Sequence, residues 1–406
     1  MSGTVGKPVA DILLGVSAAP DRPLTEKFEA LTVDGWEELL QSSSDLRVSA
    51  LVLRNLETAR QEGLAPSHVL QALQGLRRQM TLYALGQAKG AARLSQFLTS
   101  KGFEPVLLKG FALAYGAYPA AVLRPLRDVD ILLDRDEAAA AQDALLKESA
   151  YDYLPKKHQG APRHHLRQLT DLETGLTIEI HHGISASGRW AHEDRLVRRL
   201  LSDTRTVDLL GQSVRVPLPL PNLLHLIAHS GLEHCLDNGP VTLADMHFLL
   251  AGKTREVGCD VLMHECEAIG LRNSLLLLAA LARRHGATWV DGELAACCSV
   301  AEPLLEAATH AALPKLADAE DIKLARKLDR QVKQMGWRAP FAMMMSPDRK
   351  MLADIVGVAP DSPWRWLGYP GWLLARARRF IAARRNTRSS GLGAAERDLT
   401  TWLQIG

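Results

Sequence analysis

Residues 106–133 read VLLKGFALAYGAYPAAVLRPLRDVDILL and carry the strongest structural signal in the chain. The apolar run at 106–108 ends in a Lys-Gly pair, and the segment at 111–118 then has a helical pattern that stops at Pro119. A second strand is expected at 128–133. The stretch therefore predicts a strand, a tight turn, a helix and another strand.

The segments that follow extend this pattern into a small sheet. Asp134, with Glu137 three residues later, predicts the capped start of an Ala-rich helix that runs to about residue 149. Strands are expected at 165–170 and 176–182, joined as a hairpin by a turn that contains Gly175. Together these elements predict a compact mixed α/β core.

The rest of the chain has a helical pattern. Breaks at Gly63 and Pro66 interrupt amphipathic segments before the core, and a short hairpin at 206–216 interrupts the helices that follow it. The predicted fold class is therefore α+β, a mostly helical chain with a small mixed-sheet core. The expected parts are a helical N-terminal region (1–102), the α/β core (103–188), a helical C-terminal domain with the hairpin (189–360) and an Arg-rich C-terminal segment (361–406).

The composition is that of a soluble, globular, mostly helical protein. Hydrophobic residues make up 47% of the 406 residues and charged residues 23%, which excludes wholesale disorder and a collagen-like repeat. Aromatic residues make up only 5%, whereas β-sandwiches and β-barrels depend on aromatic and β-branched side chains. A chain of this length is expected to form two or three domains.

Three features of the chain favour a cytoplasmic location. The longest apolar run, at 275–282, is far shorter than the roughly 20 residues that cross a bilayer, so no membrane span is expected. Only Lys7 precedes the apolar stretch at 9–16, which makes a poor signal peptide and is expected to be retained. The five cysteines include no Cys-x-x-Cys pair, which favours a reducing compartment without a disulfide framework.

Charge is distributed unevenly along the chain. Lys and Arg total 48 against 46 Asp and Glu, and the formal charge of +2 argues against nucleic-acid binding by bulk charge. Residues 362–395 contain no acid but seven arginines, and subtracting these charges from +2 leaves −5 elsewhere. This Arg-rich tail suggests an anionic partner, but a terminal helix that docks its tryptophans on the body is the favoured interpretation. The arginines are Arg365, Arg376, Arg378, Arg379, Arg384, Arg385 and Arg388.

Three carboxylates are expected to converge on one face of the sheet. Side chains alternate along a strand, so Asp128 and Asp130 point to the same side. Glu179 joins them if its strand pairs beside theirs. Three crowded acids repel one another unless a cation neutralises them. Mg²⁺, with Mn²⁺ as the alternative, suits such oxygen ligands and is usually completed by substrate phosphates.

Basic residues beside these acids fit a nucleoside triphosphate such as ATP. Lys109 and Gly110 lie where a strand ends and a helix begins, and helix N-termini favour phosphate. Arg124 and Arg127 add forked donors for phosphate oxygens. Two metal ions can polarise the α-phosphate, and Glu179 can accept the proton of an attacking hydroxyl.

The order of these motifs resembles a known family. Strand-Lys-Gly-helix, then Arg-x-x-Arg-Asp-x-Asp, then Glu-x-His on a later strand is similar to the uncharacterised bacterial nucleotidyltransferases of the polymerase-β-like nucleotidyltransferase superfamily. The resemblance implies metal-dependent nucleotidyl transfer, with Asp128, Asp130 and Glu179 as the metal-binding acids. The superfamily usually has Gly-Ser where this chain has Lys109-Gly110, which implies altered phosphate handling. The resemblance extends to Trp36, Leu224, His225, His229, His234 and Asp245.

Several residues have a plain structural interpretation beside the functional one. Lys109 can form an ion pair with one of the acids, and Arg127 can pair with Asp128. His181 should face the same side as Glu179, as part of the site or as a polar residue at its rim. The pair His225 and His229, one helical turn apart, has the spacing of a zinc site, but a structural or cleft-lining pair is favoured.

The leading functional hypothesis is an Mg²⁺-dependent enzyme that moves an NMP group from an NTP to an acceptor. A small molecule, a sugar or a peptide is a better candidate acceptor than a nucleic acid. One alternative is a tailoring transferase that acts on a peptide, sugar or phosphorylated intermediate of a biosynthetic pathway. Another is a nucleotide-binding or scaffold protein without turnover.

Overall fold

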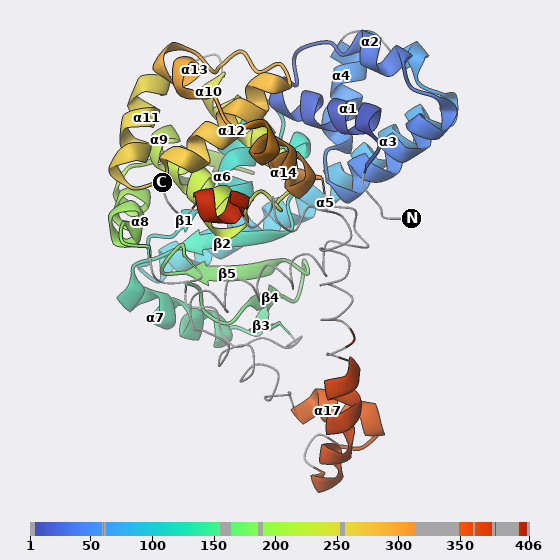
Figure 1. The fold of residues 1–406 in the computed structure, drawn as a ribbon. Helices are drawn as coiled ribbons and strands as arrows, with labels where there is room; N and C mark the ends of the chain where they lie inside the picture. The colour runs from blue at the N-terminus through green and yellow to red at the C-terminus, as the bar shows by residue number, and fades with distance from the viewer. Residues whose placement is uncertain are drawn as a thin grey trace. The chain divides into compact units, whose positions relative to one another are not determined.

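The chain is described by a computed structural model over residues 5–58, 60, 62–154, 164–185, 190–251, 256–313, 349–359, 362–375, 378 and 398–403. It divides into two compact units. The larger unit, residues 4–313 with 399–406, contains all the strands found among the described residues (Figure 1). The smaller unit, residues 1–3 and 314–398, contributes α17 (Arg349–Val356) and the 3-10 helix η4 (Pro363–Gly368).

Most of the Arg-rich tail lies outside the described residues. Of its seven arginines, only Arg365 and Arg378 are described, so the anionic partner stays a prediction. In the described part of the chain, no helix combines the length and the apolar character that crossing a bilayer requires.

Helices precede and follow the sheet, as the sequence predicts. The N-terminal helices are α1 (Lys7–Ala18), α2 (Thr25–Glu29), α3 (Val33–Asp45), α4 (Ser49–Thr58), the short η1 (Glu62–Leu64) and α5 (Ser67–Ser100). Within the sheet region lie α6 (Lys109–Gly116), η2 (Ala121–Leu123), α7 (Arg135–Leu146) and α8 (Glu193–Ser202). The later helices are α9 (Pro219–Ile227), the π-helix η3 (Ala228–Glu233), α10 (Val241–Leu250), α11 (Cys259–Ala268), α12 (Arg272–Arg284), α13 (Gly292–Cys297) and α14 (Glu302–Ala312).

Seven strands form one mixed sheet, which confirms the α+β class. Their order is β3-β4-β5-β2-β1-β7-β6. β2 runs parallel to β5 and antiparallel to β1, while β1 runs parallel to β7. The strands are β1 (Val106–Leu107), β2 (Asp128–Leu132), β3 (Tyr151–Tyr153), β4 (Leu169–Asp171), β5 (Thr177–His181), β6 (Thr204–Leu209) and β7 (Gln212–Pro217).

The two hairpins predicted from the sequence are present. β4 and β5 pair antiparallel around the turn at 171–175, and β6 and β7 pair antiparallel around Gly211. The second hairpin was expected among the later helices, but it belongs to the same sheet because β7 pairs with β1. The sheet therefore continues past residue 188. The three-residue strand β3 was not predicted, because it is too short to show an alternating pattern.

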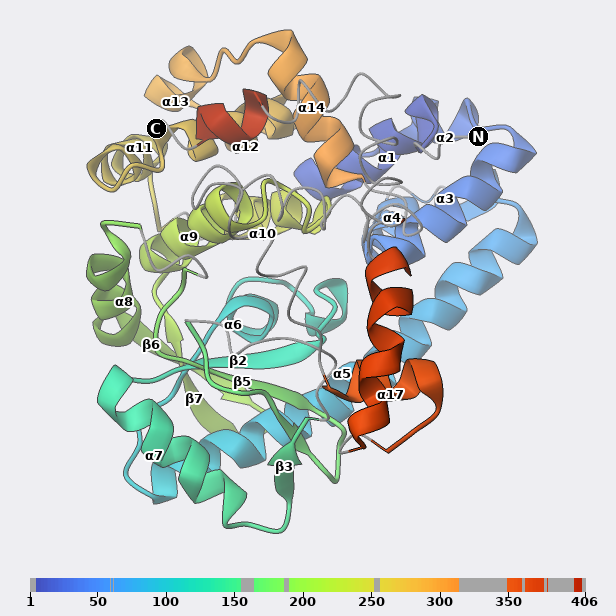
Figure 2. The same ribbon diagram turned by 60° about the horizontal axis from the view of Figure 1, so that its bottom comes forward.

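The alternation along β2 separates a core face from a polar face. Val129 and Ile131 are fully buried in a core that also includes α5, α6 and α7. Each such side chain contributes roughly 1.5–3 kcal/mol through burial. Asp128 and Asp130 point the other way. In both ribbon views, α9, α10 and α12 lie on the opposite side of the sheet from α7 (Figures 1 and 2).

The apolar stretch at 9–16 is part of the larger unit's core. It forms most of α1, in which Ile12, Leu13 and Leu14 are fully buried. α1 packs against α10, α3 and α4. The N-terminal helices are thereby packed against the helices that follow the sheet.

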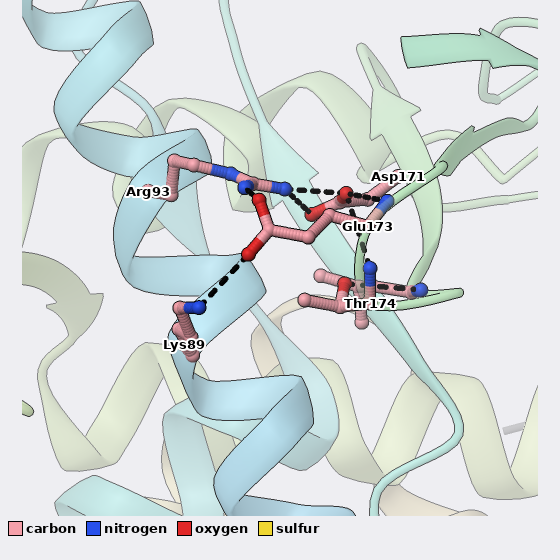
Figure 3. A network of polar contacts seen from close by, with 6 residues as sticks. Lys89, Arg93, Asp171, Glu173 and Thr174 are labelled. Atoms are coloured by element: carbon pink, nitrogen blue, oxygen red, sulfur yellow. Dashed lines mark hydrogen bonds and ion pairs between the residues drawn. The ribbon is translucent and has the colours of Figure 1, made fainter. Parts of the chain in front are cut away.

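The long helix α5 is tied to the turn between β4 and β5 (Figure 3). Arg93 donates to both oxygens of the fully buried Asp171 and also pairs with Glu173, which accepts from Lys89 at 2.8 Å. Asp171 accepts from the backbone N–H groups of Glu173 at 2.9 Å and Thr174 at 3.4 Å. Burial alone would lower the pKa of Arg93, but the hydrogen bond and charge of Asp171 raise it.

Gly90 allows the close approach of α5 to this turn. A Cβ at Gly90 would lie 2.7 Å from Thr174 Oγ1 and 3.0 Å from Leu176 Cδ2, whereas a Cβ at the exposed Gly86 would meet nothing within 4 Å. We expect Gly86→Ala to stabilise the protein by up to about 1 kcal/mol through helix propensity. Gly90→Ala should instead destabilise it by about 1–3 kcal/mol. Chemical denaturation of both variants checks this, and equal effects would contradict the close packing.

Candidate active site

Strand pairing brings the predicted acids together. In the parallel pair β2–β5, Asp130 lies opposite Glu179 and Asp128 lies opposite Thr177. Residues paired in this way point to the same face of a sheet. The predicted convergence of the three carboxylates therefore rests on the register of two adjacent strands.

Asp130 is the centre of the site. Its side chain is 3% exposed, and Oδ1 accepts hydrogen bonds from Lys109 Nζ at 2.7 Å and from His181 Nε2 at 2.7 Å. Burial alone would raise the pKa of Asp130, but the charges and hydrogen bonds of Lys109 and His181 hold it well below its usual value. Asp130 is therefore ionised at neutral pH. The ion pair considered for Lys109 is present, and its partner is Asp130.

His181 links Asp130 to Glu179. Its Nε2 also lies 3.2 Å from Glu179 Oε2, while Glu179 Oε1 accepts from Gln168. Burial and Lys109 would lower the pKa of His181, but its hydrogen bonds to the two carboxylates raise it. As expected from the alternation, His181 faces the same side as Glu179, and it is almost fully buried within the site.

Asp128 lies at the start of β2 and is half-buried. Burial, together with the negative charges of Asp130 and Glu179, raises its pKa to about 6. Lys109 and Arg127 oppose this shift without cancelling it. Of the three acids, Asp128 is therefore the one whose negative charge the nearby cationic side chains offset least.

The Lys-Gly turn forms the first residues of α6. Lys109 has a positive φ of 47°, and Gly110 follows it in the first turn of the helix. A Cβ at Gly110 would lie 3.3 Å from Leu126 Cδ2, so the glycine allows the loop before β2 to approach the helix closely. Lys109 is held by the acids. Burial alone would lower its pKa, but the charges of Asp130 and Glu179 raise it.

The two predicted arginines have different surroundings. Arg124 Nε donates to Asp245 Oδ1 at 2.7 Å, and the same oxygen accepts from Tyr118 Oη at 2.6 Å. Arg124 Nη1 donates to Pro125 O at 3.0 Å, so two of its donors are used in contacts within the chain, one of them to α10. Arg127 is exposed and has no ion pair with Asp128 or with any other acid in the part of the chain that the structure describes. Arg127 is thus the more accessible of the two arginines.

The donor set of this site fits a divalent cation. Ligand atoms of Asp130, Glu179 and His181 all lie within 4.8 Å of one another. Asp128 lies outside this group, but its charge interacts with those of Asp130 and Glu179. Carboxylate oxygens suit Mg²⁺ and Mn²⁺, and a histidine that bonds two carboxylates can hold them in place.

Comparison with protein families agrees with this geometry. A family model described as uncharacterised nucleotidyltransferase matches residues 33–286, which is well over half of the chain. The chain belongs to this nucleotidyltransferase family. The match runs from the start of α3 to the residues just after α12, so it includes the whole sheet. None of the curated proteins compared with the chain matches it.

In this member of the family, further histidines lie near the acids. The ring centroids of His164 and His181 are 5.4 Å apart, and burial lowers the pKa of His164 to about 3. Burial also lowers the pKa of His225 to about 3 and that of His229 well below its usual range. Both are influenced by Lys109 and Asp130, so they lie near the acids as neutral imidazoles.

The zinc interpretation of His225 and His229 gains no support. Among the described residues, the potential metal-binding cluster is Asp130, Glu179 and His181, and neither histidine belongs to it. The helix that carries His225 continues into η3, a π-helix of six residues, and such bulges are frequent at functional sites. The cleft-lining interpretation stays a prediction.

Sequence reasoning missed two residues near the nucleotidyltransferase site. Gln168 was expected only as part of a strand, and its contact with Glu179 depends on the β4–β5 pairing. Arg47 lies 77 positions before Arg124 in the sequence, yet its charge interacts with Arg124, Arg127 and Asp128. No motif marks Arg47, because only tertiary packing brings it there.

Because its pKa is raised, ionisation of Asp128 lowers the stability of the fold, and this loss depends on pH. Folded Asp128 titrates near pH 6 and unfolded Asp near 3.8, so its contribution to stability falls as the pH rises from about 4 to about 6. In EDTA, we expect Asp128→Asn to be more stable than the wild type by about 1 kcal/mol near pH 4.5 and by about 3 kcal/mol at pH 7.5. Thermal unfolding at both pH values checks this.

A matched control separates this effect from general loss of charge. Asp143 is an exposed acid on α7, and Asp143→Asn should change stability little at either pH. A stability gain of Asp128→Asn that is the same at both pH values would contradict the crowding of the three acids.

Proposed function

We propose that the protein is an Mg²⁺-dependent nucleotidyltransferase that moves an NMP group from an NTP, such as ATP, to an acceptor hydroxyl. The observation that carries the proposal is the cluster of Asp130, Glu179 and His181, with Asp128 beside it, at the Lys109-Gly110 turn. Membership of the nucleotidyltransferase family supports the same reaction class.

In this proposal, Asp128, Asp130 and Glu179 hold Mg²⁺, with Mn²⁺ as a substitute. His181 keeps Asp130 and Glu179 oriented through its two hydrogen bonds. When bound, the cation neutralises the triphosphate and activates the α-phosphate. Its binding requires that Lys109 share or release Asp130, which frees the Lys109 ammonium for a phosphate oxygen.

The triphosphate is placed by the turn and the arginines. Gly110 lies in the first turn of α6, where backbone N–H groups point toward a bound anion. Arg127 is exposed beside Asp128 and can reach a phosphate oxygen, while Arg124 has less free capacity because it bonds Asp245. Lys109, Gly110, Arg124 and Arg127 are therefore proposed to bind nucleotide, with Arg127 contributing more than Arg124.

The transfer forms a bond between the acceptor oxygen and the α-phosphorus. The bond from the α-phosphorus to the bridging oxygen breaks, and pyrophosphate leaves with the electron pair. A site carboxylate takes the hydroxyl proton. Glu179 was expected in that role, but hydrogen bonding to His181 lowers its pKa although burial would raise it, so Glu179 is better suited to hold the cation.

A pyrophosphate-release assay tests the proposal. The full chain is incubated with Mg²⁺, each of the four NTPs and pools of hydroxyl-bearing sugars, peptides and small molecules, and products are measured by mass spectrometry. We expect pyrophosphate together with an acceptor whose mass has grown by one NMP. Nucleotide binding without pyrophosphate release, under conditions that include a cell extract as acceptor source, would instead support a non-catalytic nucleotide-binding or scaffold protein.

The acceptor and the cellular location complete the proposal. We propose a small molecule, sugar or peptide as the acceptor, in a tailoring step of a biosynthetic pathway, because the chain's charge of +2 offers no bulk attraction for nucleic acid. Cysteine usage without Cys-x-x-Cys pairs favours the cytoplasm.

A further inference from the structure

A cavity lies between the N-terminal helices and the loop that leads into β2. Its volume is about 260 Å³, slightly below the usual range of roughly 300–1,000 Å³ for small-molecule sites. Met80 and Tyr83 of α5 form part of one wall, and Val122 and Leu126 form part of the other. Most of the lining side chains are apolar, and none of the described residues that line it is acidic.

This cavity adjoins the nucleotidyltransferase site. Arg124 and Leu126 line it, and the same two side chains lie against the Lys109-Gly110 turn. A Cβ at Gly110 would be 3.3 Å from Leu126 Cδ2 and 3.8 Å from Arg124 Nη1. The cavity therefore borders the proposed phosphate-binding turn, with Arg124 and Leu126 as shared neighbours.

Arg47 provides a positive charge in the cavity wall that forms no ion pair with any described acid, although the charges of Asp128 and Asp245 act on it. Within the described part of the chain, its guanidinium has no hydrogen-bond or ion-pair partner, whereas Arg124 is paired with Asp245 at 2.7 Å. Burial and the positive charges of Arg127 and Arg124 lower the pKa of Arg47 to about 10. An apolar cavity with one unmatched guanidinium is complementary to an apolar molecule that carries an anionic group.

The backbone at Arg47 has a left-handed conformation. Arg47 has a φ of 61° just after α3, where Val48 N–H donates to Ser43 O at 2.8 Å. Such a helix end usually has glycine, because a left-handed conformation is unfavourable for residues with a Cβ. Arg47 therefore combines an unfavourable backbone conformation with a side chain that lines the cavity.

We propose that this cavity binds the acceptor substrate, a compact molecule with an apolar body whose carboxylate or phosphate pairs with Arg47. The assignment of the bound molecule as acceptor rests on the proposed nucleotidyl transfer. The triphosphate of the nucleotide fits the cavity less well, because it has no apolar body and the lining offers one unpaired cation. The Lys109-Gly110 turn is the better place for it.

Binding of small probes to the full chain tests separately whether the cavity requires an apolar body and whether it requires an anionic group. Ligand-detected NMR titrations would use phenyl phosphate and benzoate as apolar anions, inorganic phosphate as an anion without an apolar body, and benzyl alcohol as a neutral analogue. We expect phenyl phosphate or benzoate to bind at least about tenfold more tightly than the other two. The tighter of the two apolar anions identifies the group that pairs with Arg47.

The variant Arg47→Gly shows whether a loss of binding comes from the missing side chain or from an unstable fold. The variant relieves the positive φ, so its melting temperature should equal or exceed that of the wild type, while the Kd for the apolar anion rises about 10- to 100-fold. The matched control is Arg60→Gly, because Arg60 also has a positive φ, of 53°, but is exposed and does not line the cavity. It should leave the Kd unchanged.

Three results would overturn the assignment. The first is no saturable binding of any apolar anion, and the second is an unchanged Kd in Arg47→Gly. The third is displacement of the probe by Mg²⁺ with a non-hydrolysable ATP analogue, which would assign the cavity to the nucleotide. Because these titrations need no turnover, a chain that binds the probes through Arg47 but never releases pyrophosphate would contradict the nucleotidyl transfer and leave the anion site standing.

Discussion

Replacing Asp130 by Asn is expected to abolish Mg²⁺-dependent nucleotidyl transfer, with a loss in rate of about 10²- to 10³-fold or more. Asp130 is the acid that contacts both Lys109 and His181 and lies opposite Glu179 in the sheet. The amide cannot supply the negative charge that a divalent cation requires. Calorimetry with Mg²⁺ and a non-hydrolysable ATP analogue should show no metal-dependent binding.

The controls for this variant address folding and general charge loss. Lys109 and His181 lose their shared anionic partner in Asp130→Asn, so circular dichroism and thermal unfolding must confirm a folded chain. Asp143→Asn makes the same chemical change at an exposed position of α7 and should keep full activity. Metal-dependent nucleotide affinity that is unchanged in a folded Asp130→Asn variant would exclude Asp130 as a metal ligand.

Replacing Asp245 by Ala is expected to give the largest loss of stability, about 3–5 kcal/mol. Asp245 is 1% exposed, and its Oδ1 accepts from both Arg124 Nε and Tyr118 Oη. Without the carboxylate, the guanidinium of Arg124 would be buried beside α10 without its counter-ion. Urea denaturation of the variant and the wild type measures the difference.

Two further variants show whether the buried charge causes this loss. Tyr118→Phe removes one hydrogen bond to Asp245 and should cost only about 1 kcal/mol. The double variant Arg124→Leu with Asp245→Leu removes both charges and should recover much of the lost stability. A double variant as unstable as Asp245→Ala would show that packing against α10, and not an uncompensated charge, dominates.

The sequence was sufficient for most of the elements of the sheet region and for the proximity of Asp130 and Glu179. Local patterns predicted β2, α6, the capped start of α7 and both hairpins, because alternation, glycine turns and the cap at Asp134 are all encoded within a few residues. The side of the sheet on which Asp128, Asp130 and Glu179 meet followed from strand alternation once β2 and β5 were paired.

Long-range contacts lay beyond such reasoning. The pairing of β1 with β7 joins Val106 to Arg215, and no local pattern records a partner more than a hundred residues away. The hydrogen bond between Arg124 and Asp245 could not be predicted for the same reason, because the motif before β2 does not indicate which later helix packs beside it. Arg47 could not be predicted for two reasons: it lies far from the site in sequence, and its backbone conformation is unusual for arginine.

The single long helix α5 restricts how the chain can change in length. Its first half supplies Met80 and Tyr83 to the cavity, and its second half is fixed to the β4–β5 turn through Gly90 and Arg93. Inserting one residue between Tyr83 and Gly90 would rotate one half against the other by about 100° and shift it by about 1.5 Å. The helix could not then keep both its contacts in the cavity wall and its contacts with the β4–β5 turn. We expect relatives of this protein to vary in side chains along the exposed face of α5 and to keep the number of residues between these two points constant.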